Sequence, residues 1–301
     1  MAIEPNIPNE WAPLRTVVVG HGISMGPIPT VESAIDPTSK HHIANGTYPS
    51  PESVAAQLDG LAQCLSAEGV EVLRPVNLDD VEQVFTRDVG LVVDGTLIRS
   101  RTIEERSAEW SGIVPLLQDN SWIDLPDGVH LEGGDVIVLE DALVVGVTRR
   151  TAWHQLQVVR SLPSALDFLA QQFPDREVIG IELHKDDGNP LASALHLDCA
   201  YMPLADGGAL ICNEAFIEVE QLNVLNNRHS YSINISLQEA TELQTNLLHV
   251  SPDTLLIDPR FGRVAQALRG KGFRLIEHSM HHVGRMGGLF RCTTMPLRRH
   301  H

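Results

Sequence analysis

A short hairpin that recurs along the chain constrains the fold more than any other feature of this sequence. The segment GLVVDGTLIRS contains two apolar strands around Asp94-Gly95, a dipeptide that strongly favours a two-residue turn. Two later segments repeat the pattern: DVIVLEDALVVGV, and CAYMPLADGGALICN with its turn at residues 206–208. Helical stretches are expected after the hairpins, the first two over residues 103–117 and 153–173, and each is followed by a strand: SWIDLP, EVIGIEL or YSINIS.

The two ends of the chain supply further elements of the same kind. A β-branched strand at residues 16–20 precedes a helix that ends near Gly69 and the strand VEVLRPV. Towards the C-terminus, helices are expected over residues 237–250, before TLLIDP, and over 262–272, before FRLIEHSM. The chain thus contains about five strand-strand-helix-strand units.

These units indicate an α/β chain that folds as one closed domain over residues 1–301, with the functional residues gathered at one end. A Rossmann-type winding is disfavoured, because neither G-x-G-x-x-G between a strand and a helix nor a phosphate-binding loop occurs. The stretch 21–51 reads as too polar and too broken for regular structure, and we expect this long loop to cover the site.

The charge of the chain limits the classes of partner. There are 22 Lys and Arg against 39 Asp and Glu, which gives a formal net charge of -17. A field of this sign repels nucleic-acid phosphates and anionic membranes, and slightly favours a small cationic substrate. No apolar run reaches the roughly 18 residues that a membrane-spanning helix needs. We therefore expect neither a nucleic-acid partner nor a membrane.

The chain has four cysteines, and one of them is a candidate nucleophile. They lie far apart, without a C-x-x-C pair or a secretory leader, which indicates reduced thiols in the cytoplasm. Cys64, Cys199 and Cys212 are expected in the core, since they fall on an apolar helix face or in and beside strands. Cys292, in RMGGLFRCTTMPLRRH, stands where the backbone is about to turn. A cationic setting there would lower the pKa of its thiol and make it reactive.

Three polar stretches interrupt apolar, strand-like surroundings. They carry Arg87 and Asp88 in VFTRDVG, Glu132 and Asp135 in HLEGGDVIVL, and His196 and Asp198 in ALHLDCAYMPL. On a strand, the spacing of His196 and Asp198 would place both side chains on one face. Together with Cys292 these residues offer a nucleophile, an acid/base histidine, a carboxylate to orient it, and further carboxylates that could bind a cation.

Each stretch also has a plain structural interpretation. An Arg-Asp pair before a strand can be a surface salt bridge, E-G-G-D can form a bulge or turn, and an isolated cysteine can be a buried apolar residue. His-x-Asp could be a structural pair or two metal ligands. No H-E-x-x-H or other tight ligand spacing occurs among the 14 histidines, so we expect no metal.

Taken together and in order, VFTRDVG, HLEGGDV, LHLDCAYMPL and GGLFRCTTMPLRR resemble the guanidine-modifying (pentein) superfamily of arginine deiminases, dimethylarginine hydrolases and amidinotransferases. The resemblance covers nearly the whole chain. The fold that it implies is a five-bladed α/β propeller, which agrees with the five units counted above. It implies no cofactor, and a small cationic guanidino substrate such as arginine; a homo-oligomer is left open.

The resemblance also assigns roles to individual residues. It implies that Cys292 is the nucleophile, that His196 is the acid and base, and that Glu132 orients the second nucleophile. Asp88 and Asp198 would bind the planar guanidinium ion through paired hydrogen bonds. Two further residues of the first motif, Phe85 and Arg87, are added as candidate substrate contacts.

The resemblance leaves the outcome of the reaction open. Glu132 within E-G-G-D and the ending Pro296-Leu297-x-Arg299 look deiminase-like, whereas NEWAPLRTVVVG and Cys-Thr-Thr followed by Arg298-Arg299 look transferase-like. We prefer hydrolysis, through a covalent S-alkylthiouronium adduct, over transfer of the amidino group to an amine. A non-catalytic binding protein with the same fold is the alternative from another class.

Overall fold

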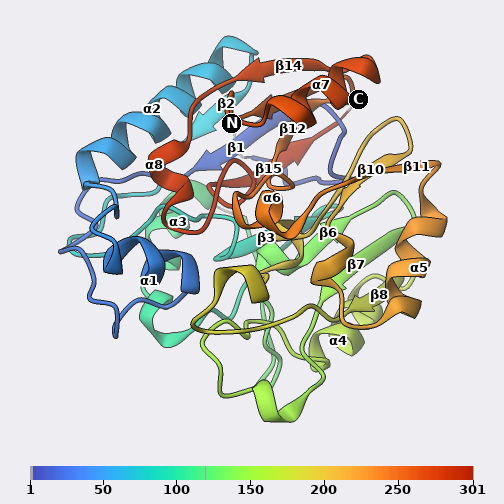
Figure 1. Ribbon diagram of the computed structural model, residues 1–301, viewed down its shortest axis with the longest axis horizontal. Coiled ribbons are helices and arrows are strands. Elements are labelled where there is room, and N and C mark those ends of the chain that lie inside the picture. The colour runs from blue at the N-terminus through green and yellow to red at the C-terminus, as the bar shows by residue number, and fades with distance from the viewer. Residues whose placement is uncertain (1–2, 119, 301) are drawn as a thin grey trace.

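The computed structural model describes residues 3–118 and 120–300 of the chain. Its strands form five sheets of three strands each, and every sheet is built in the same way (Figure 1). A middle strand pairs antiparallel with one neighbour and parallel with the other. Three of the five antiparallel pairs are the expected hairpins, within residues 90–99, 136–146 and 201–211, and in each sheet the third strand follows a helix. The predicted repeat of strand, strand, helix and strand is therefore present.

The strands are grouped by sheet as follows: β15 (Thr294–Arg299), β1 (Leu14–Val19) and β2 (Glu71–Leu73); β3 (Gly90–Val93), β4 (Thr96–Arg99) and β5 (Ile123–Asp124); β6 (Val136–Val138), β7 (Ala142–Gly146) and β8 (Glu177–Ile181); β9 (Tyr201–Pro203), β10 (Gly208–Ile211) and β11 (Tyr231–Asn234); β12 (Leu248–Ser251), β13 (Thr254–Ile257) and β14 (Arg274–Glu277).

The helices that precede the parallel third strands are α2 (Pro51–Ala67), α3 (Trp110–Leu117), α4 (Ser164–Gln172), α5 (Val219–Arg228) and α7 (Gly262–Gly270). Three shorter helices are α1 (Pro37–Ala44), α6 (Leu237–Thr241) and α8 (His281–Gly284). Parallel neighbours need such a crossover, because a two-residue turn can join antiparallel strands only. No helix of the described part of the chain is both long enough and apolar enough to cross a bilayer.

One sheet joins the two ends of the chain. Strand β15 pairs antiparallel with β1, for example Val17 with Pro296 and Val19 with Thr294. Figure 1 shows the blue β1 beside the red β15. Because β15 follows Cys292 directly, this pairing fixes the C-terminal motif in the interior of the molecule.

Four local predictions were wrong. The stretch 21–51 contains α1, which begins at Pro37 after its N-cap Asp36. Residues 237–250 are not one helix: α6 ends at Thr241, Leu243 has a positive φ of 66°, and β12 follows. The apolar residues of this segment have helical spacing, but residues 248–251 form the edge strand β12 instead, because they pair antiparallel with β13.

The helix expected over 153–173 is α4 alone, since Asp187 accepts the backbone N–H groups of Gln157 and Val158 and holds that part of the chain outside a helix. The His-x-Asp segment is not a strand either. It enters a short 3₁₀ turn, Leu197–Cys199, whose first backbone N–H donates to the side chain of Asp135.

Candidate active site

Cys292 lies in the turn between α8 and β15, and the side chain of Asn246 forms hydrogen bonds with this turn. Asn246 Oδ1 accepts the backbone N–H of Cys292 at 3.1 Å and that of Leu289 at 3.2 Å. Its Nδ2 donates to Cys292 Sγ at 3.1 Å. Because two backbone donors fix the amide oxygen, the amide N–H must face the sulfur. Such a donor stabilises a thiolate more than a thiol.

Asp198 also lies beside the sulfur, but it is already paired. Its carboxylate oxygens are 3.8 and 3.9 Å from Cys292 Sγ. Arg291 Nη1 donates to Asp198 Oδ2 at 2.8 Å, and Nη2 of the same guanidinium donates to Glu10 Oε1 at 2.9 Å. All three ionic side chains are buried. Burial of this kind is tolerated because each charge faces an opposite charge.

The His196 ring lies between two carboxylates, those of Glu132 and Asp88, which come from two other segments of the chain. Its Nε2 is 2.9 Å from Glu132 Oε2, and its Nδ1 is 3.6 Å from Asp88 Oδ1. Arg160 Nη1 donates to both oxygens of Glu132, at 3.3 and 3.2 Å. Gly134 makes this approach feasible, since a Cβ there would lie 2.7 Å from the His196 ring and 2.8 Å from Asp88 Oδ1.

These surroundings set the protonation of the site. Burial opposes the charge on His196, but Asp88, Asp135 and Glu132 together raise its pKa to about 9. Burial opposes the charge on Glu132 in the same way, but Arg160 and His196 lower its pKa to about 2. The pKa of Cys292 is raised well above its ordinary value by a hydrogen bond with Cys199, by burial and by Asp198. Near neutral pH the empty site therefore holds a neutral thiol and an imidazolium.

Asp88 differs from Glu132 and Asp198 because one of its carboxylate oxygens accepts no hydrogen bond. Arg106 Nη1 donates to Asp88 Oδ2 at 2.7 Å, and the same guanidinium pairs with Glu109. Asp88 Oδ1 is buried without a hydrogen-bond partner, as is His196 Nδ1. An orphaned buried acceptor is costly unless a ligand or water supplies a donor.

Both orphaned atoms belong to residues that line a cavity of about 210 Å³. Its wall also includes Cys292, Phe85, Arg106, Glu109, Glu82, Arg160, Leu195, Met286 and Gly287. Burial, with Glu109 adding like charge, raises the pKa of Glu82 to about 7. The cavity therefore offers a thiol, an acid/base group and spare carboxylate oxygens to one small ligand.

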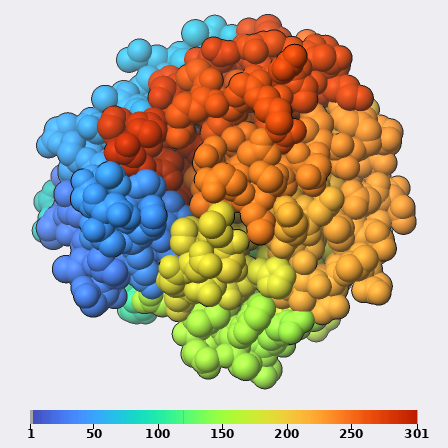
Figure 2. All heavy atoms as spheres, in the orientation of Figure 1, coloured from blue at the N-terminus to red at the C-terminus, as the bar shows by residue number. Residues whose placement is uncertain are grey.

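The predicted loop 21–51 forms one side of this cavity. Ala34, Asp36, Ser39 and Tyr48 line it together with Met286 and Gly287, and Ser39 Oγ donates to the backbone oxygen of Met286 at 3.4 Å. In Figure 2 the blue segment that contains α1 lies against the dark red segment that contains α8. Residues far apart in the sequence thus enclose the same space.

The structure separates the predicted site residues into two groups. Asp88, Phe85, His196 and Cys292 lie on the cavity wall. Glu132 lies behind His196, and Asp198 behind Cys292, and the cavity lining includes neither. The assignment of Asp198 to guanidinium binding stays a prediction.

Arg87 does not line the cavity, and its role as a substrate contact stays a prediction. Its Nε donates to the backbone oxygen of Arg291 at 3.2 Å, and the side chain is buried. Burial, reinforced by the charge of Arg291, lowers the pKa of Arg87 to about 9. Phe85 and Asp88 of the same motif line the cavity, and Arg87 does not.

Within the described residues, Asp88, Glu132 and His196 are the group whose ligand atoms could hold a metal ion, since these atoms lie within 4.8 Å of one another. Arg106 and Arg160 already donate to the two carboxylates. A divalent cation would have to displace or face both guanidinium groups at short distance. The donor set therefore fits proton transfer better than metal binding.

Sequence reasoning missed several residues that complete the site. Asn246 lay inside a segment predicted as helix, so its contact with the sulfur had no signal. Arg106, Arg160 and Arg291 each pair with a site carboxylate. Charged side chains in otherwise apolar segments could have pointed to Arg291, but the partner of each arginine is set only by long-range packing.

Chemically, the arrangement suits addition of sulfur to a cationic, planar carbon. A bound cation would offset the negative charge of Asp88 and Asp198 and help Cys292 to ionise. The imidazolium of His196 can then give a proton to a departing nitrogen.

Comparisons with known proteins identify related chains. A family model described as N,N dimethylarginine dimethylhydrolase, eukaryotic, matches residues 32–299. The uncharacterized protein YkgA of Bacillus subtilis is 31% identical over 272 residues, which cover 89% of this chain and 87% of YkgA.

Two solved structures share the mixed α/β fold. SxtG, an amidinotransferase from Microseira wollei in the saxitoxin biosynthetic pathway, has a TM-score of 0.76 at 21% identity, and the match covers 98% of this chain and 97% of SxtG. The N-terminal domain of ArgZ, an arginine dihydrolase from the ornithine-ammonia cycle in cyanobacteria, has a TM-score of 0.77 at 21% identity, and the match covers 94% and 97% of the two chains.

The predicted membership of the guanidine-modifying superfamily is confirmed, and with it the prediction of an enzyme that is either a hydrolase of guanidino C–N bonds or an amidinotransferase. With a family model that matches residues 32–299, this chain belongs to the N,N-dimethylarginine dimethylhydrolase family.

Proposed function

We propose that the protein is a cysteine-dependent hydrolase of arginine or a related guanidino compound, such as a methylated arginine. The observation that carries this proposal is the shared cavity of Cys292, His196 and Asp88, in which the Asp88 Oδ1 acceptor has no hydrogen-bond partner. The family model is named for a hydrolase of methylated arginine, and ArgZ is described as an arginine dihydrolase.

Recognition begins at Asp88. A guanidinium ion is planar, cationic and rich in N–H donors, so it can donate to Asp88 Oδ1 while its carbon faces Cys292 Sγ. Asp198 lies on the far side of the sulfur and reinforces the negative potential that draws the cation in. Phe85 lines the cavity beside Cys292, where an apolar ring can cover the face of the guanidinium group.

The first half-reaction forms an adduct on the sulfur. The Cys292 thiolate attacks the guanidinium carbon, and Asn246 Nδ2 stabilises the thiolate before the attack. His196 protonates the departing amine as the C–N bond breaks, which leaves an S-alkylthiouronium group on Cys292. A variant of the ArgZ N-terminal domain is described as covalently bonded to a reaction intermediate, which supports a covalent route.

In the second half-reaction, neutral His196 takes a proton from water while Glu132 and Arg160 hold the imidazole in place. Water adds to the thiouronium carbon, the C–S bond breaks, and a ureido product leaves with the thiolate restored. If a bound amine replaces water, the product is a new guanidino compound. This transferase route is the second candidate, because SxtG matches nearly the full length of the chain.

We further propose that residues 1–301 act as one domain and that the five sheets close into a five-bladed α/β propeller. The pairing of β15 with β1 supports closure, since it joins the last segment of the chain to the first. The substrate would then lie at one end of the central axis, where His196, Asp88 and Cys292 from three different sheets or their connections meet.

The experiment is a product analysis with a defined set of substrates. The protein is incubated with arginine, methylated arginine and simpler guanidines, with and without glycine as amine acceptor, and products are identified by mass spectrometry. A ureido product formed without added amine is expected. A guanidino product formed only with added amine would replace hydrolysis by transfer.

Cys292→Ser is the matched catalytic control, because serine keeps the shape of the side chain but is a far weaker nucleophile. We expect turnover to fall below detection while the far-ultraviolet circular dichroism spectrum is unchanged. Substantial residual turnover would exclude the covalent route. No turnover of any guanidine by the native enzyme, together with a Cys292 that no alkylating agent labels even with guanidinium present, would support the non-catalytic alternative.

A further inference from the structure

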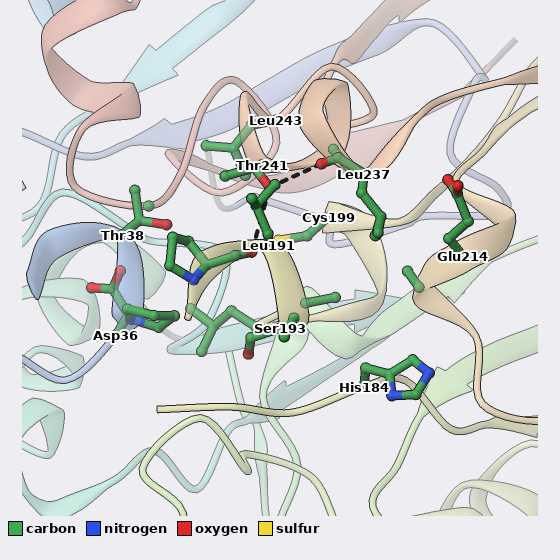
Figure 3. A pocket seen from close by; sticks show the side chains of 18 residues that line it. Asp36, Thr38, His184, Leu191, Ser193, Cys199, Glu214, Leu237, Thr241 and Leu243 are labelled. Atoms are coloured by element: carbon green, nitrogen blue, oxygen red, sulfur yellow. Dashed lines mark hydrogen bonds between the residues drawn. The ribbon is translucent and has the colours of Figure 1, made fainter. Parts of the chain in front are cut away.

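A second cavity adjoins the active-site cavity. Its volume is about 280 Å³, and it shares Asp36, Leu195 and Gly287 with the active-site cavity. Figure 3 shows it enclosed by Leu191, Ser193, Leu237 and Leu243, with the sulfur of Cys199 at its inner end. One layer of residues therefore separates the two cavities.

Cys199 and Cys292 meet within that layer. Cys199 Sγ is 3.6 Å from Asp198 Oδ1, and Cys292 Sγ is 3.9 Å from the same oxygen. Both cysteines are free, and both are buried, at 6% and 3% exposed. Each thiol thus lines a different cavity, and both contact the same oxygen of Asp198.

We propose that Cys199 is the resolving thiol of the active site, and that it forms a reversible disulfide with Cys292 when the protein meets hydrogen peroxide or an organic hydroperoxide. A water molecule occupies roughly 30 Å³ of liquid volume, so both cavities can admit a molecule as small as peroxide. Disulfide closure requires close sulfur atoms, and the two sulfurs lie against the same carboxylate oxygen, Asp198 Oδ1, at 3.6 and 3.9 Å.

The chemistry proceeds in two balanced steps. The Cys292 sulfur, which Asn246 Nδ2 contacts, attacks one peroxide oxygen; the S–O bond forms, the O–O bond breaks, and the hydroxide released takes the thiol proton of Cys292 to become water. Cys199 then attacks the Cys292 sulfur, the S–S bond forms, and the S–O bond breaks. Hydroxide leaves and takes the thiol proton of Cys199, so two thiols and one peroxide yield one disulfide and two waters.

The other two cysteines lack this geometry. Cys64 is half-buried on α2, and Cys212 is buried with its pKa raised to about 11 by burial. The residues lining the two cavities include neither. The consequence for turnover rests on the proposed role of Cys292, whereas formation of the disulfide depends on the thiol pair alone.

The experiment treats the reduced full-length protein with an equimolar amount of hydrogen peroxide. Remaining thiols are blocked, and non-reducing peptide mapping by mass spectrometry follows. We expect a cross-linked peptide pair that contains Cys199 and Cys292, with a mass lower by two hydrogens than the separate peptides. Turnover should be lost and then restored by dithiothreitol. Absence of the cross-link in native protein that has lost free Cys292 would overturn the proposal.

Cys199→Ser and Cys199→Ala should lose turnover irreversibly under peroxide, because the Cys292 sulfenic acid without a resolving thiol is oxidised on to sulfinic acid. Cys64→Ser and Cys212→Ser are the controls and should recover like the native protein. Recovery of the Cys199 variants to the native extent would also overturn the proposal. Because the cross-link is read by mass, its presence can be judged even if no guanidine is turned over.

Discussion

The sequence predicts the same role, guanidinium binding, for Asp88 and Asp198, yet the structure places the two carboxylates in different environments. Both are buried, and both pair with one arginine: Asp88 with Arg106 and Asp198 with Arg291, at 2.7 and 2.8 Å. Asp88 lies on the cavity wall and keeps one oxygen without a hydrogen-bond partner, 3.6 Å from His196 Nδ1. Asp198 is covered by two thiols and by a guanidinium group.

The difference shows that a carboxylate can serve a cationic substrate in two ways. Asp88 offers an oxygen to the ligand directly. Asp198 tunes the nucleophile, because its charge raises the pKa of the Cys292 thiol until a cation arrives. A motif that identifies both residues does not separate these roles; the partners of each oxygen do.

The largest effect is expected for substrate binding. Asp88→Asn should lower kcat/KM for a guanidino substrate about 10- to 100-fold, mainly through KM, because a charge-assisted hydrogen bond contributes about 1.5 to 3 kcal/mol. Asp198→Asn should raise KM much less. Steady-state kinetics measures both, with the exposed Asp127→Asn as control. Equal KM effects at the two positions would break the distinction.

The pH dependence of stability should respond to Asp88 and not to Asp198. The pKa of His196 in the folded state, about 9, exceeds its unfolded value of roughly 6.5. Its stabilising contribution is therefore fully present below about pH 6.5 and is lost as pH rises towards 9, which amounts to about 2 kcal/mol between about pH 6.5 and 8.5.

Urea unfolding across that window measures this loss. The decline should be smaller in Asp88→Asn, because Asp88 is a leading cause of the raised His196 pKa, and should match the native protein in Asp198→Asn. His196→Gln should remove the histidine contribution from the curve. An identical decline in the native protein and in Asp88→Asn would contradict the assignment.

A third prediction concerns Asn246, whose amide N–H donates to the Cys292 sulfur. Asn246→Asp replaces the N–H donor with a carboxylate oxygen and should raise the pKa of Cys292 further. Alkylation by iodoacetamide near neutral pH should slow about tenfold, the equivalent of one pKa unit. Asn246→Ala should slow it less, since it adds no charge. Alkylation as fast as in the native protein would show that the amide does not stabilise the thiolate.

The smallest effect is expected for Asp198→Asn in the same assay without substrate. Removal of a negative charge beside the sulfur lowers the thiol pKa, so alkylation should quicken about threefold. Added guanidinium should accelerate alkylation of the native protein more than that of this variant. Slower alkylation of Asp198→Asn would mean that Asp198 assists the thiolate in another way.

Much of the fold was predictable from local patterns. The turn at Asp94-Gly95, the apolar strands around it and the recurring helix followed by a strand depend on neighbours in the chain, and all five sheets repeat that order. The motifs that carry Asp88, His196 and Cys292 could also be recognised from the sequence, and the structure places these three residues on one cavity wall. The helix expected over 237–250 failed because pairing with β13, a contact outside the segment, decided its conformation.

The sequence by itself determined the repeating unit, the order of the motifs and the chemistry of their side chains, because these follow from turn geometry and residue type. Only the tertiary structure decided that β15 pairs with β1, that Asn246 donates to the Cys292 sulfur, that Cys199 lies behind it, and that Arg87 faces away. Each of these contacts joins distant segments, and its free energy depends on burial and on partners that no local pattern contains.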